Sequence, residues 1–388
     1  MMQALVSRRL ERCHNIDDLR REAKRRLPTP VFDFIDGGAD DEVTLADNRR
    51  AYGRYSLVPR QCAGLERESV DLSTTVLGQQ LAWPVFTSPW GLQTLIHAHG
   101  EVGLAQAAHD SGTAFALSSF SGTRMEAVAE AAPGPRFFQL QPARSWEIMD
   151  DLMDRARRAG YTALLLTVDN PTHGNRERDH HNGFDVPQRF TLASWLSIAS
   201  HPGWALSAAC RKLEFANYAM YLSPPERDTE WLFEQTVFSV DWETVARLAA
   251  RWDGPFAVKG ILSPEDAVRA ADAGVSAVVV SNQGARHFDY APATFDVLPE
   301  ICEAVGERVE VILDGGIRRG TDVLKALALG ARACMTGRPF AYGLAAGGRI
   351  GAARALSLLK SEIHRDMLFL GAADLSQITT DYLRARVP

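Results

Sequence analysis

The sequence predicts an α/β protein built around a single (β/α)8, or TIM, barrel. Short apolar segments alternate with amphipathic segments along most of the 388 residues, which is the pattern of a parallel sheet covered by helices. The short segments are almost wholly apolar, as expected for strands that are buried on both faces. Eight such strands close a barrel, and we expect them at 83–87, 113–117, 137–140, 163–167, 255–259, 277–281, 310–314 and 333–337.

The connecting segments 101–111, 145–159, 264–273 and 320–329 have the periodicity of amphipathic helices. Residues 1–60 form a helical lead-in, in which the segment Phe32–Gly38 ends a helix at two glycines. The barrel is expected over 61–365, followed by a C-terminal tail, 366–388. A long insertion after strand four, at about 180–240, lacks clear periodicity, and its place at the barrel mouth predicts a lid or binding loop.

The composition of the chain argues against nucleic-acid binding, metal binding, secretion and a membrane-spanning segment. The net charge is −6 and no long basic block occurs, so nucleic acid is not expected as a partner. The five cysteines are scattered, without CxxC spacing, which predicts reduced thiols, a cytoplasmic location and no metal site. Residues 1–26 lack the apolar core of a signal peptide. The most apolar stretch, Phe190–Cys210, is interrupted by serines, His201 and Pro202, so we expect no membrane partner. If the protein did touch a membrane surface, this stretch would make the contact.

Polar residues close or follow nearly every predicted strand. In a barrel these carboxyl ends meet at one face, where active sites lie, and a purely structural barrel does not need them. After strands seven and eight, Asp314-Gly315-Gly316 with Arg318, and Gly337-Arg338, predict a phosphate site made of glycine backbone and cations. The alternative to a phosphate site is that these glycines form ordinary turns and that the two arginines are exposed to solvent. Lys259 ends strand five, where a buried ammonium either serves a bound group or pairs with Asp314 or Asp169.

Taken together, these motifs resemble the FMN-dependent 2-hydroxy acid oxidase/dehydrogenase family, which includes glycolate oxidase and the lactate and mandelate dehydrogenases. The resemblance covers roughly residues 15–365. It rests on the segments Phe32–Gly38, Leu117–Ser119, Phe137–Leu140, Thr167–Asp169, Gly174–Arg176, Lys259-Gly260, Ser281–Arg286 and Leu313–Gly320.

The resemblance implies non-covalently bound FMN, with Lys259 stabilising the negative charge of the reduced ring. It also implies that Arg176 and Arg286 bind a substrate carboxylate, which suits the bidentate geometry of arginine. A homotetramer is implied as well, with oxygen or a separate electron carrier as acceptor, since no haem-binding segment is expected before the barrel. The implied FMN-binding residues are Pro89, Trp90, Gly91, Ser118, Gln139, Thr167, Lys259, Ser281, Asp314, Gly315, Gly316, Arg318, Gly337 and Arg338.

The sequence departs from the family in the substrate half of the site. The family's two pocket tyrosines map to Phe34 and Gln141, and its catalytic histidine maps to Gln283. A glutamine amide does not titrate, so it cannot accept the substrate proton. Loss of a general base typically costs ~10²–10⁴ in rate. Asp169, which would orient the histidine, is retained and is expected to accept a hydrogen bond from Gln283.

Three functions follow. A flavin-dependent oxidation of an amino acid, an amine or another altered substrate needs no strong base, because a neutral amine has its own lone pair. A conventional 2-hydroxy acid oxidase would need another base, such as His173, although a structural role is the commoner reading for His173 and His287. A non-catalytic flavin-binding protein is the third. Phe34, Trp90 and Phe120 predict an apolar or aromatic substituent on a small carboxylic acid.

Overall fold

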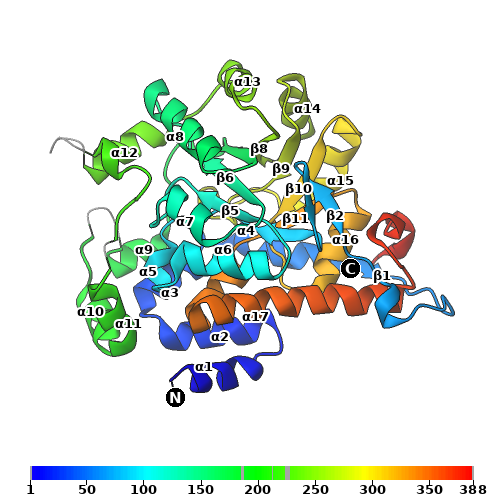
Figure 1. Ribbon diagram of the computed structural model, residues 1–388, viewed down its shortest axis with the longest axis horizontal. Helices are drawn as coiled ribbons and strands as arrows, with labels where there is room; N and C mark the ends of the chain where they lie inside the picture. Colours follow the sequence, from blue (N-terminus) through cyan, green and yellow to red (C-terminus); the bar gives the residue numbers. More distant parts are fainter. Residues whose placement is uncertain (1, 185–187, 212, 223–227, 387–388) are drawn as a thin grey trace.

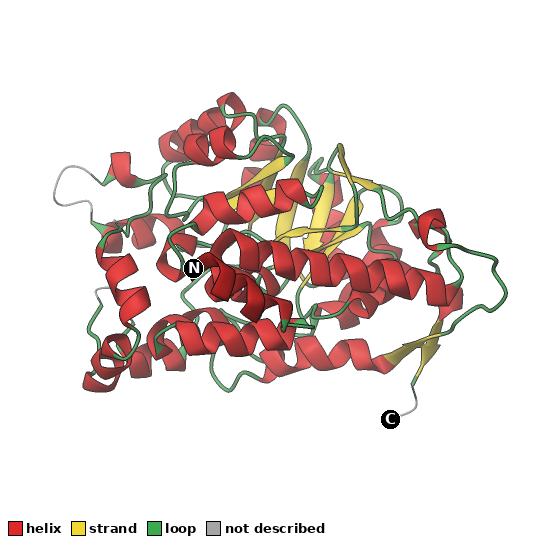
Figure 2. Cartoon of the chain, turned by 60° about the horizontal axis from the view of Figure 1, so that its bottom comes forward, coloured by secondary structure: helices red, strands yellow, loops and turns green. Residues whose placement is uncertain are grey.

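The computed structural model describes residues 2–184, 188–211, 213–222 and 228–386. Its centre is one sheet of parallel strands with the order β4-β11-β10-β9-β8-β7-β6-β5 (Figures 1 and 2). All eight predicted strands are found, with ends within two residues of those expected. They are β4 (Val85–Thr87), β5 (Phe115–Ser118), β6 (Arg136–Leu140), β7 (Ala163–Thr167), β8 (Phe256–Ile261), β9 (Ala277–Val280), β10 (Glu310–Asp314) and β11 (Ala333–Thr336).

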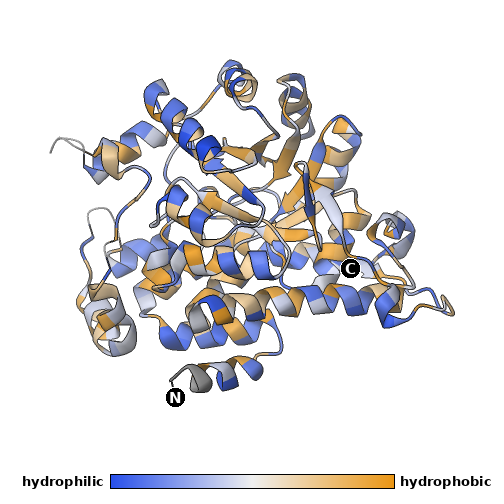
Figure 3. Ribbon diagram, in the orientation of Figure 1, coloured by the Kyte–Doolittle hydropathy of each residue, from blue (hydrophilic) through white to orange (hydrophobic). Residues whose placement is uncertain are grey.

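The two ends of the sheet meet and nearly close the barrel. The backbone N–H of Thr87 donates to Ala114 O at 3.4 Å, and Ala116 N–H donates to Thr87 Oγ1 at 3.0 Å. Side chains alternate between the barrel interior and the helices outside, as in Leu164 and Leu165 of β7. The antiparallel hairpin of β2 (Thr74–Val76) and β3 (Gln79–Leu81) adds apolar residues to the interior cluster. Figure 3 shows that the barrel strands are strongly hydrophobic.

Helices surround the barrel, and their apolar faces pack on the strands. The four helices expected from periodicity are confirmed within about one residue at each end. The surrounding helices are α5 (Gln93–Ile96), α6 (Gly100–Asp110), α7 (Met125–Ala131), α8 (Trp146–Arg158), α13 (Trp242–Arg251), α14 (Pro264–Asp272), α15 (Thr294–Val305), α16 (Gly320–Ala328) and α17 (Arg338–Leu370), the last interrupted by non-helical backbone at Gly347 and Gly348.

The N-terminal lead-in is helical, as predicted, and packs against the far end of the chain. Helix α17 lies along α2, and the short strand β1 (Tyr55–Leu57) pairs with β12 (Leu383–Ala385) (Figure 1). The C-terminal tail was expected to begin at residue 366, but this residue lies inside α17, and the segment after the helix begins at Gly371. The lead-in helices are α1 (Met2–Glu11), α2 (Ile16–Arg26), α3 (Thr29–Asp36) and α4 (Val43–Arg50).

The insertion after strand four is more regular than its sequence indicates. Where no periodicity was evident, it contains α9 (Glu177–Asn182), α10 (Leu192–Ala199), α11 (Pro202–Ala209) and α12 (Thr229–Thr236), while 185–187, 212 and 223–227 lie outside the described residues. Local signals start these helices: Thr191 Oγ1 accepts from Ser194 N–H, and Asp228 Oδ1 accepts from Trp231 N–H. Helices of eight residues or fewer are too short for an apolar period to be recognised. Among the described residues no helix is long and apolar enough to cross a membrane.

Candidate active site

A cavity of about 1560 Å³ opens at the carboxyl ends of the barrel strands. It brings together nearly all of the predicted site residues, although they come from segments far apart in the sequence. Asp169 and Ser281 are absent from its wall and contact residues that line it. The predicted residues on the wall are Phe34, Pro89, Trp90, Gly91, Ser118, Gln139, Gln141, Thr167, His173, Arg176, Lys259, Gln283, Arg286, Asp314, Gly315, Gly316, Arg318, Gly337 and Arg338.

The predicted phosphate cradle has the geometry of an anion site. Gly315 and Gly316 have φ of 140° and 72°, and a Cβ on Gly316 would lie 1.9 Å from Asn48 O, so only glycine fits there. Arg318 lines the cavity, and its buried Nε has no hydrogen-bond partner among the described residues. Gly337 precedes the first turn of α17, whose free N–H groups favour an anion. The guanidinium of Arg318 donates to Ile317 O through Nη1 at 2.8 Å, which leaves its Nε–H to meet an anion. A cation in this state beside glycine backbone and a helix N-terminus fits a phosphate group.

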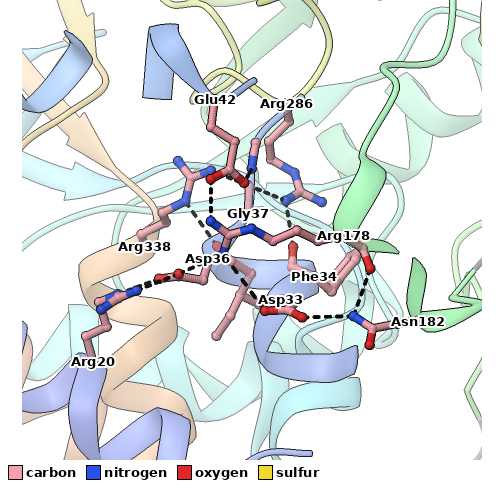
Figure 4. A network of polar contacts seen from close by, with 12 residues as sticks. Arg20, Asp33, Phe34, Asp36, Gly37, Glu42, Arg178, Asn182, Arg286 and Arg338 are labelled. Carbon is pink, nitrogen blue, oxygen red and sulfur yellow. Dashed lines mark hydrogen bonds and ion pairs between the residues drawn. The ribbon is translucent and has the colours of Figure 1, made fainter. Parts of the chain in front are cut away.

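Arg338 has a different setting from the one expected. Its Nε donates to Ile35 O at 3.0 Å, Nη1 to Gly284 O at 2.9 Å and Nη2 to Gly37 O at 2.8 Å. The guanidinium therefore links the end of α3 to the turn after β9 (Figure 4). The Phe32–Gly38 segment, for which the sequence indicated a helix end and the pocket residue Phe34, also supplies carbonyl acceptors that hold the arginines at the cavity.

Lys259 is the centre of a buried polar network. Its side chain is only 2% exposed, and Nζ donates to Ser281 Oγ and to Gln283 Oε1, each at 3.0 Å. Nζ also lies 3.3 Å from Asp314 Oδ2, so one of the two ion pairs considered for this lysine is present. Asp314 accepts further hydrogen bonds from the hydroxyls of Ser88 and Ser281. This pairing compensates the cost of burying the ammonium and fixes Nζ at the cavity wall.

Ser118, Gln139 and Thr167 form a chain of hydrogen bonds along one wall. Ser118 Oγ donates to Gln139 Oε1 at 2.8 Å, and Gln139 Nε2 donates to Thr167 Oγ1 at 2.9 Å. All three side chains are buried and line the cavity. Their donors and acceptors suit the polar edge of a planar ring, as expected for FMN.

Gln283 occupies a left-handed turn against Asp169. The φ angles of Gln283, Gly284 and Ala285 are 53°, 62° and 62°, a conformation that costs energy for the two non-glycine residues. Gln283 Nε2 donates to Asp169 Oδ1 at 2.9 Å. Burial raises the pKa of Asp169 to about 6, against the opposing effect of Lys259. The expected Gln283–Asp169 contact is therefore present.

Arg286 and Arg176 form a cationic wall. Arg286 Nη1 donates to Phe34 O at 2.6 Å, and its guanidinium carbon lies 5.0 Å from the centre of the Phe34 ring. Arg176 Nε donates to Asp179 Oδ2 at 2.6 Å. Burial, with Arg176 as a neighbouring cation, lowers the pKa of Arg286 to about 9. Two cations in a partly dry cavity define a site for a carboxylate.

Around α3, other charged residues hold this wall in place, and the sequence analysis missed them. Arg20 of α2 donates to both oxygens of Asp36, at 2.6 and 2.7 Å, and Arg178 of α9 lies 3.4 Å from Asp36 and pairs with Glu42 (Figure 4). Asn182 donates to Asp33 at 2.8 Å. These contacts join the lead-in, the insertion and the barrel mouth. Their only sequence signal was the acidic Phe32–Gly38 segment.

Part of the remaining cavity wall is aromatic. Phe120 packs on Phe215 and Phe233 with ring centres 5.2 and 6.0 Å apart. Phe34 lies against Phe184 at 5.2 Å. These rings come from the barrel, the insertion and the lead-in, and only Phe34 and Phe120 were recognised from the sequence.

Gln141, at a pocket tyrosine position in the resemblance, has both ends of its amide engaged. Nε2 donates to Thr236 O at 2.9 Å, and Oε1 accepts from Asn170 Nδ2 at 3.3 Å. The side chain is 3% exposed and lies on the cavity wall. Gln141 therefore attaches α12 of the insertion to the barrel while it borders the pocket.

Three histidines, His173, His180 and His287, line the cavity. Burial and the nearby Arg176 lower the pKa of His173, whose ring meets Phe233 edge-on at 5.4 Å between centres. The same two effects lower the pKa of His287 to about 3, and its buried Nδ1 has no partner within the described segments. The rings of His173 and His287 are therefore neutral near pH 7 and able to accept a hydrogen bond.

A barrel with a phosphate cradle, a ring-edge wall, a buried lysine and an arginine pair defines a flavin-nucleotide oxidoreductase that acts on carboxylates. The family model described as FMN-dependent dehydrogenase matches residues 23–385, and the chain belongs to this family. It is an enzyme of the FMN-dependent 2-hydroxy acid oxidase/dehydrogenase type.

The relatives cover nearly the whole chain. L-lactate oxidase from Nostoc sp. (strain PCC 7120) is 39% identical over 95% of this chain and 97% of its own length. Glycolate oxidase from Spinacia oleracea is 37% identical over 96% and 95%. The crystal structure of the monotopic membrane protein (S)-mandelate dehydrogenase has a TM-score of 0.91 and 34% identity, covering 96% of this chain and 99% of that chain.

Proposed function

We propose that this protein uses FMN to oxidise a carboxylic acid at its 2-position, and that the group oxidised is an amine or another altered substituent. The observation that carries the proposal is the fixed amide of Gln283, with its oxygen on Lys259 and its nitrogen on Asp169. A hydroxyl substrate must lose its O–H proton to a base. Gln283 holds the position that the family resemblance gives to that base and cannot take up the proton.

The site's own residues suit a neutral amine. Arg176 and Arg286 would hold the carboxylate, and their positive charges, with that of Lys259, lower the pKa of an ammonium bound among them. The neutral amine then needs no strong base. When bound, FMN supplies the two-electron acceptor for this oxidation. The phosphate cradle and the wall of Ser118, Gln139 and Thr167 are the residues that would hold it.

The aromatic wall favours an aromatic substituent. A mandelate oxidase variant solved with (S)-mandelic acid has a TM-score of 0.81 and 35% identity, over 96% of this chain and 98% of that chain. In the present cavity Phe120, Phe215 and Phe233 provide the apolar surface for such a ring.

A conventional 2-hydroxy acid oxidation is the second candidate. It is favoured by the curated relatives and by His173, a neutral imidazole on the cavity wall that could act as the base. We also propose, from the family likeness, a homotetramer in the cytoplasm with oxygen or a separate carrier as electron acceptor. Light scattering on the purified protein tests the oligomeric state.

The deciding experiment is an anaerobic titration of the flavin absorbance with a matched pair, mandelate and phenylglycine. Bleaching by phenylglycine alone is the expected result. Bleaching by mandelate would overturn it in favour of the second candidate, and His173→Ala should then remove an ionisation from the pH–rate profile. A flavin that stays oxidised with both compounds, and with matched pairs of other side chains, would indicate a non-catalytic flavin-binding protein.

A further inference from the structure

Four buried polar atoms of cavity-lining residues have no hydrogen-bond partner among the described residues. Two are donors, Nε1 of Trp90 and Nε of Arg318, and both residues belong to the set expected to bind FMN. The other two are Oδ1 of Asn170 and Nδ1 of His287. Leaving such an atom buried and unpaired costs free energy, so a bound group that meets it is favoured.

The side-chain amide of Asn170 is oriented by its neighbours. Gln141 Nε2 donates to the backbone carbonyl of Thr236 at 2.9 Å, which directs Gln141 Oε1 toward Asn170. Asn170 Nδ2 donates to that oxygen at 3.3 Å. Because a backbone carbonyl can only accept, the contact with Thr236 fixes the orientation of both amides in turn. Asn170 Oδ1 is therefore a hydrogen-bond acceptor at the cavity wall.

His287 supplies a second acceptor. Its ring donates a hydrogen bond to the backbone carbonyl of Thr172, and Nδ1 is the ring nitrogen that has no partner in the described part of the chain. Burial and the positive charges of Arg176 and Arg286 lower the pKa of the ring to about 3, so only one nitrogen carries a proton near pH 7. These contacts assign the proton to Nε2 and the lone pair to Nδ1.

The two acceptors come from segments that lie against each other beside the arginine pair. A Cβ on Gly174 would lie 2.1 Å from Arg286 O and 2.4 Å from His287 Cα, so the loop after β7 packs directly on the turn after β9. Asn170 and Arg176 belong to this loop, and Arg286 precedes His287 in the turn. The acceptors therefore accompany the cations that would hold the substrate carboxylate, where a substituent on the adjacent carbon is expected.

We propose that Asn170 Oδ1 and His287 Nδ1 accept the two N–H groups of a 2-amino acid and so select it over the hydroxy acid of the same skeleton. A neutral primary amine has two N–H donors and one lone pair. Two neutral acceptors take both donors and leave the lone pair free for the oxidation. A hydroxyl group has one donor and leaves one acceptor unmet. This inference rests on the proposed function and names the residues that recognise the amine.

The test measures binding without turnover. The matched ligands are 2-amino-2-phenylpropionate and 2-hydroxy-2-phenylpropionate, in which a methyl group replaces the hydrogen on C2, so the flavin cannot oxidise them. The change in flavin absorbance of the purified holoprotein gives the dissociation constant of each ligand. We expect the amino compound to bind about tenfold more tightly, because the hydroxyl leaves one buried acceptor unmet. In His287→Phe and in Asn170→Leu one acceptor remains, which either ligand can meet, so the two constants should become nearly equal.

Asn175→Leu is the matched control. Asn175 belongs to the same loop, and its amide donates to Asp40 at 2.8 Å without lining the cavity, so this variant should keep the wild-type preference. Flavin absorbance and thermal unfolding show whether each variant is folded, and the two test variants lie on separate segments. Wild-type protein that binds the hydroxy compound at least as tightly would overturn the inference. A preference that persists in a folded His287→Phe or Asn170→Leu protein would overturn the assignment of that acceptor.

Failure of this inference is distinguishable from failure of the proposed function. Bleaching of the flavin by phenylglycine, with equal binding of the two methyl compounds, would support the function and overturn the acceptor pair. Bleaching by mandelate alone, with tighter binding of the amino compound that both variants abolish, would overturn the function and support the acceptor pair as an amine-binding site.

Discussion

The side-chain nitrogen of Gln283 lies 2.9 Å from Oδ1 of Asp169, while its oxygen accepts from Lys259 at 3.0 Å. These two contacts define the orientation of the amide, because the carboxylate selects the NH₂ group and the ammonium selects the oxygen. Gln283 can therefore position a substrate but cannot remove its proton.

Replacing Gln283 with histidine should restore a base next to Asp169. We expect the rate of flavin reduction by a 2-hydroxy acid to rise by about 10²-fold, within the range of a general base. Anaerobic stopped-flow absorbance measures this rate. Gln283→Ala removes the amide without adding a base and should give no increase. An unchanged rate in a folded, FMN-loaded Gln283→His protein would show that the position does not control proton removal.

Asp169 should make stability depend on pH. Burial raises its pKa from 3.8 to about 6, so the folded protein keeps a proton that the unfolded chain has released between these values. Its contribution to the free energy of unfolding is therefore greatest below about pH 4 and is lost as the pH rises through 6. Asp169→Asn should remove this loss and raise stability at pH 7 by up to about 3 kcal/mol. Urea unfolding of both proteins at pH 4 and pH 7 measures these free energies. If the two proteins differed by the same amount at both pH values, Asp169 would not be the titrating group.

Arg286→Lys should weaken carboxylate binding. Lysine keeps the charge but loses the planar pair of donors and the hydrogen bond to Phe34 O. We expect KM for the carboxylate substrate to rise by about 10²-fold with a smaller change in kcat. The carboxamide analogue provides the control, because its binding should change little. Arg349→Lys, at an exposed arginine of α17, should leave both constants unaltered.

Arg318→Met should lower FMN affinity. The buried Nε of Arg318 has no partner in the part of the chain that the structure describes, and Arg318 lines the cavity beside Gly315 and Gly316, so its removal should weaken FMN binding by roughly 10–100-fold. The adjacent Arg319 pairs with Glu362 at 2.7 Å and does not line the cavity, which makes Arg319→Met the matched control. Fluorescence of released FMN during dialysis measures the difference. Equal loss from both variants would place the phosphate elsewhere.

Gly260→Ala should destabilise the fold at the site. Gly260 has φ of 115°, and a Cβ there would lie 2.4 Å from Asp169 Cγ, so both strain and a clash result. We expect a loss of about 2–4 kcal/mol in the free energy of unfolding. Gly274 has φ of 81° with open space around it, so Gly274→Ala isolates the cost of the backbone conformation. Similar losses in the two variants would show that contact with Asp169 is unimportant.

Much of the barrel could be predicted because its strands are short, apolar and regularly spaced. For β7 and β10, the apolar pattern of the sequence predicted the first and the last residue of the strand correctly. The insertion could not be predicted, because helices such as α10 depend on a cap at Thr191 and on attachment to Thr29. The cap is local but stands before a helix too short to show an apolar period, and the contact between Thr29 and Ser197 joins residues far apart in the chain, which no local pattern encodes.

The chain by itself determined the barrel, the polar strand ends and the presence of a glutamine at position 283. These are properties of local pattern and residue identity. Only the tertiary structure decided which polar groups meet: that Lys259 holds Gln283, and that Arg338 donates to carbonyls at the end of α3. It also decided that, among the described residues, Arg318 and His287 are left with unpartnered buried nitrogens. Pairing and exposure depend on three-dimensional packing, which brings together segments that sequence separation keeps apart.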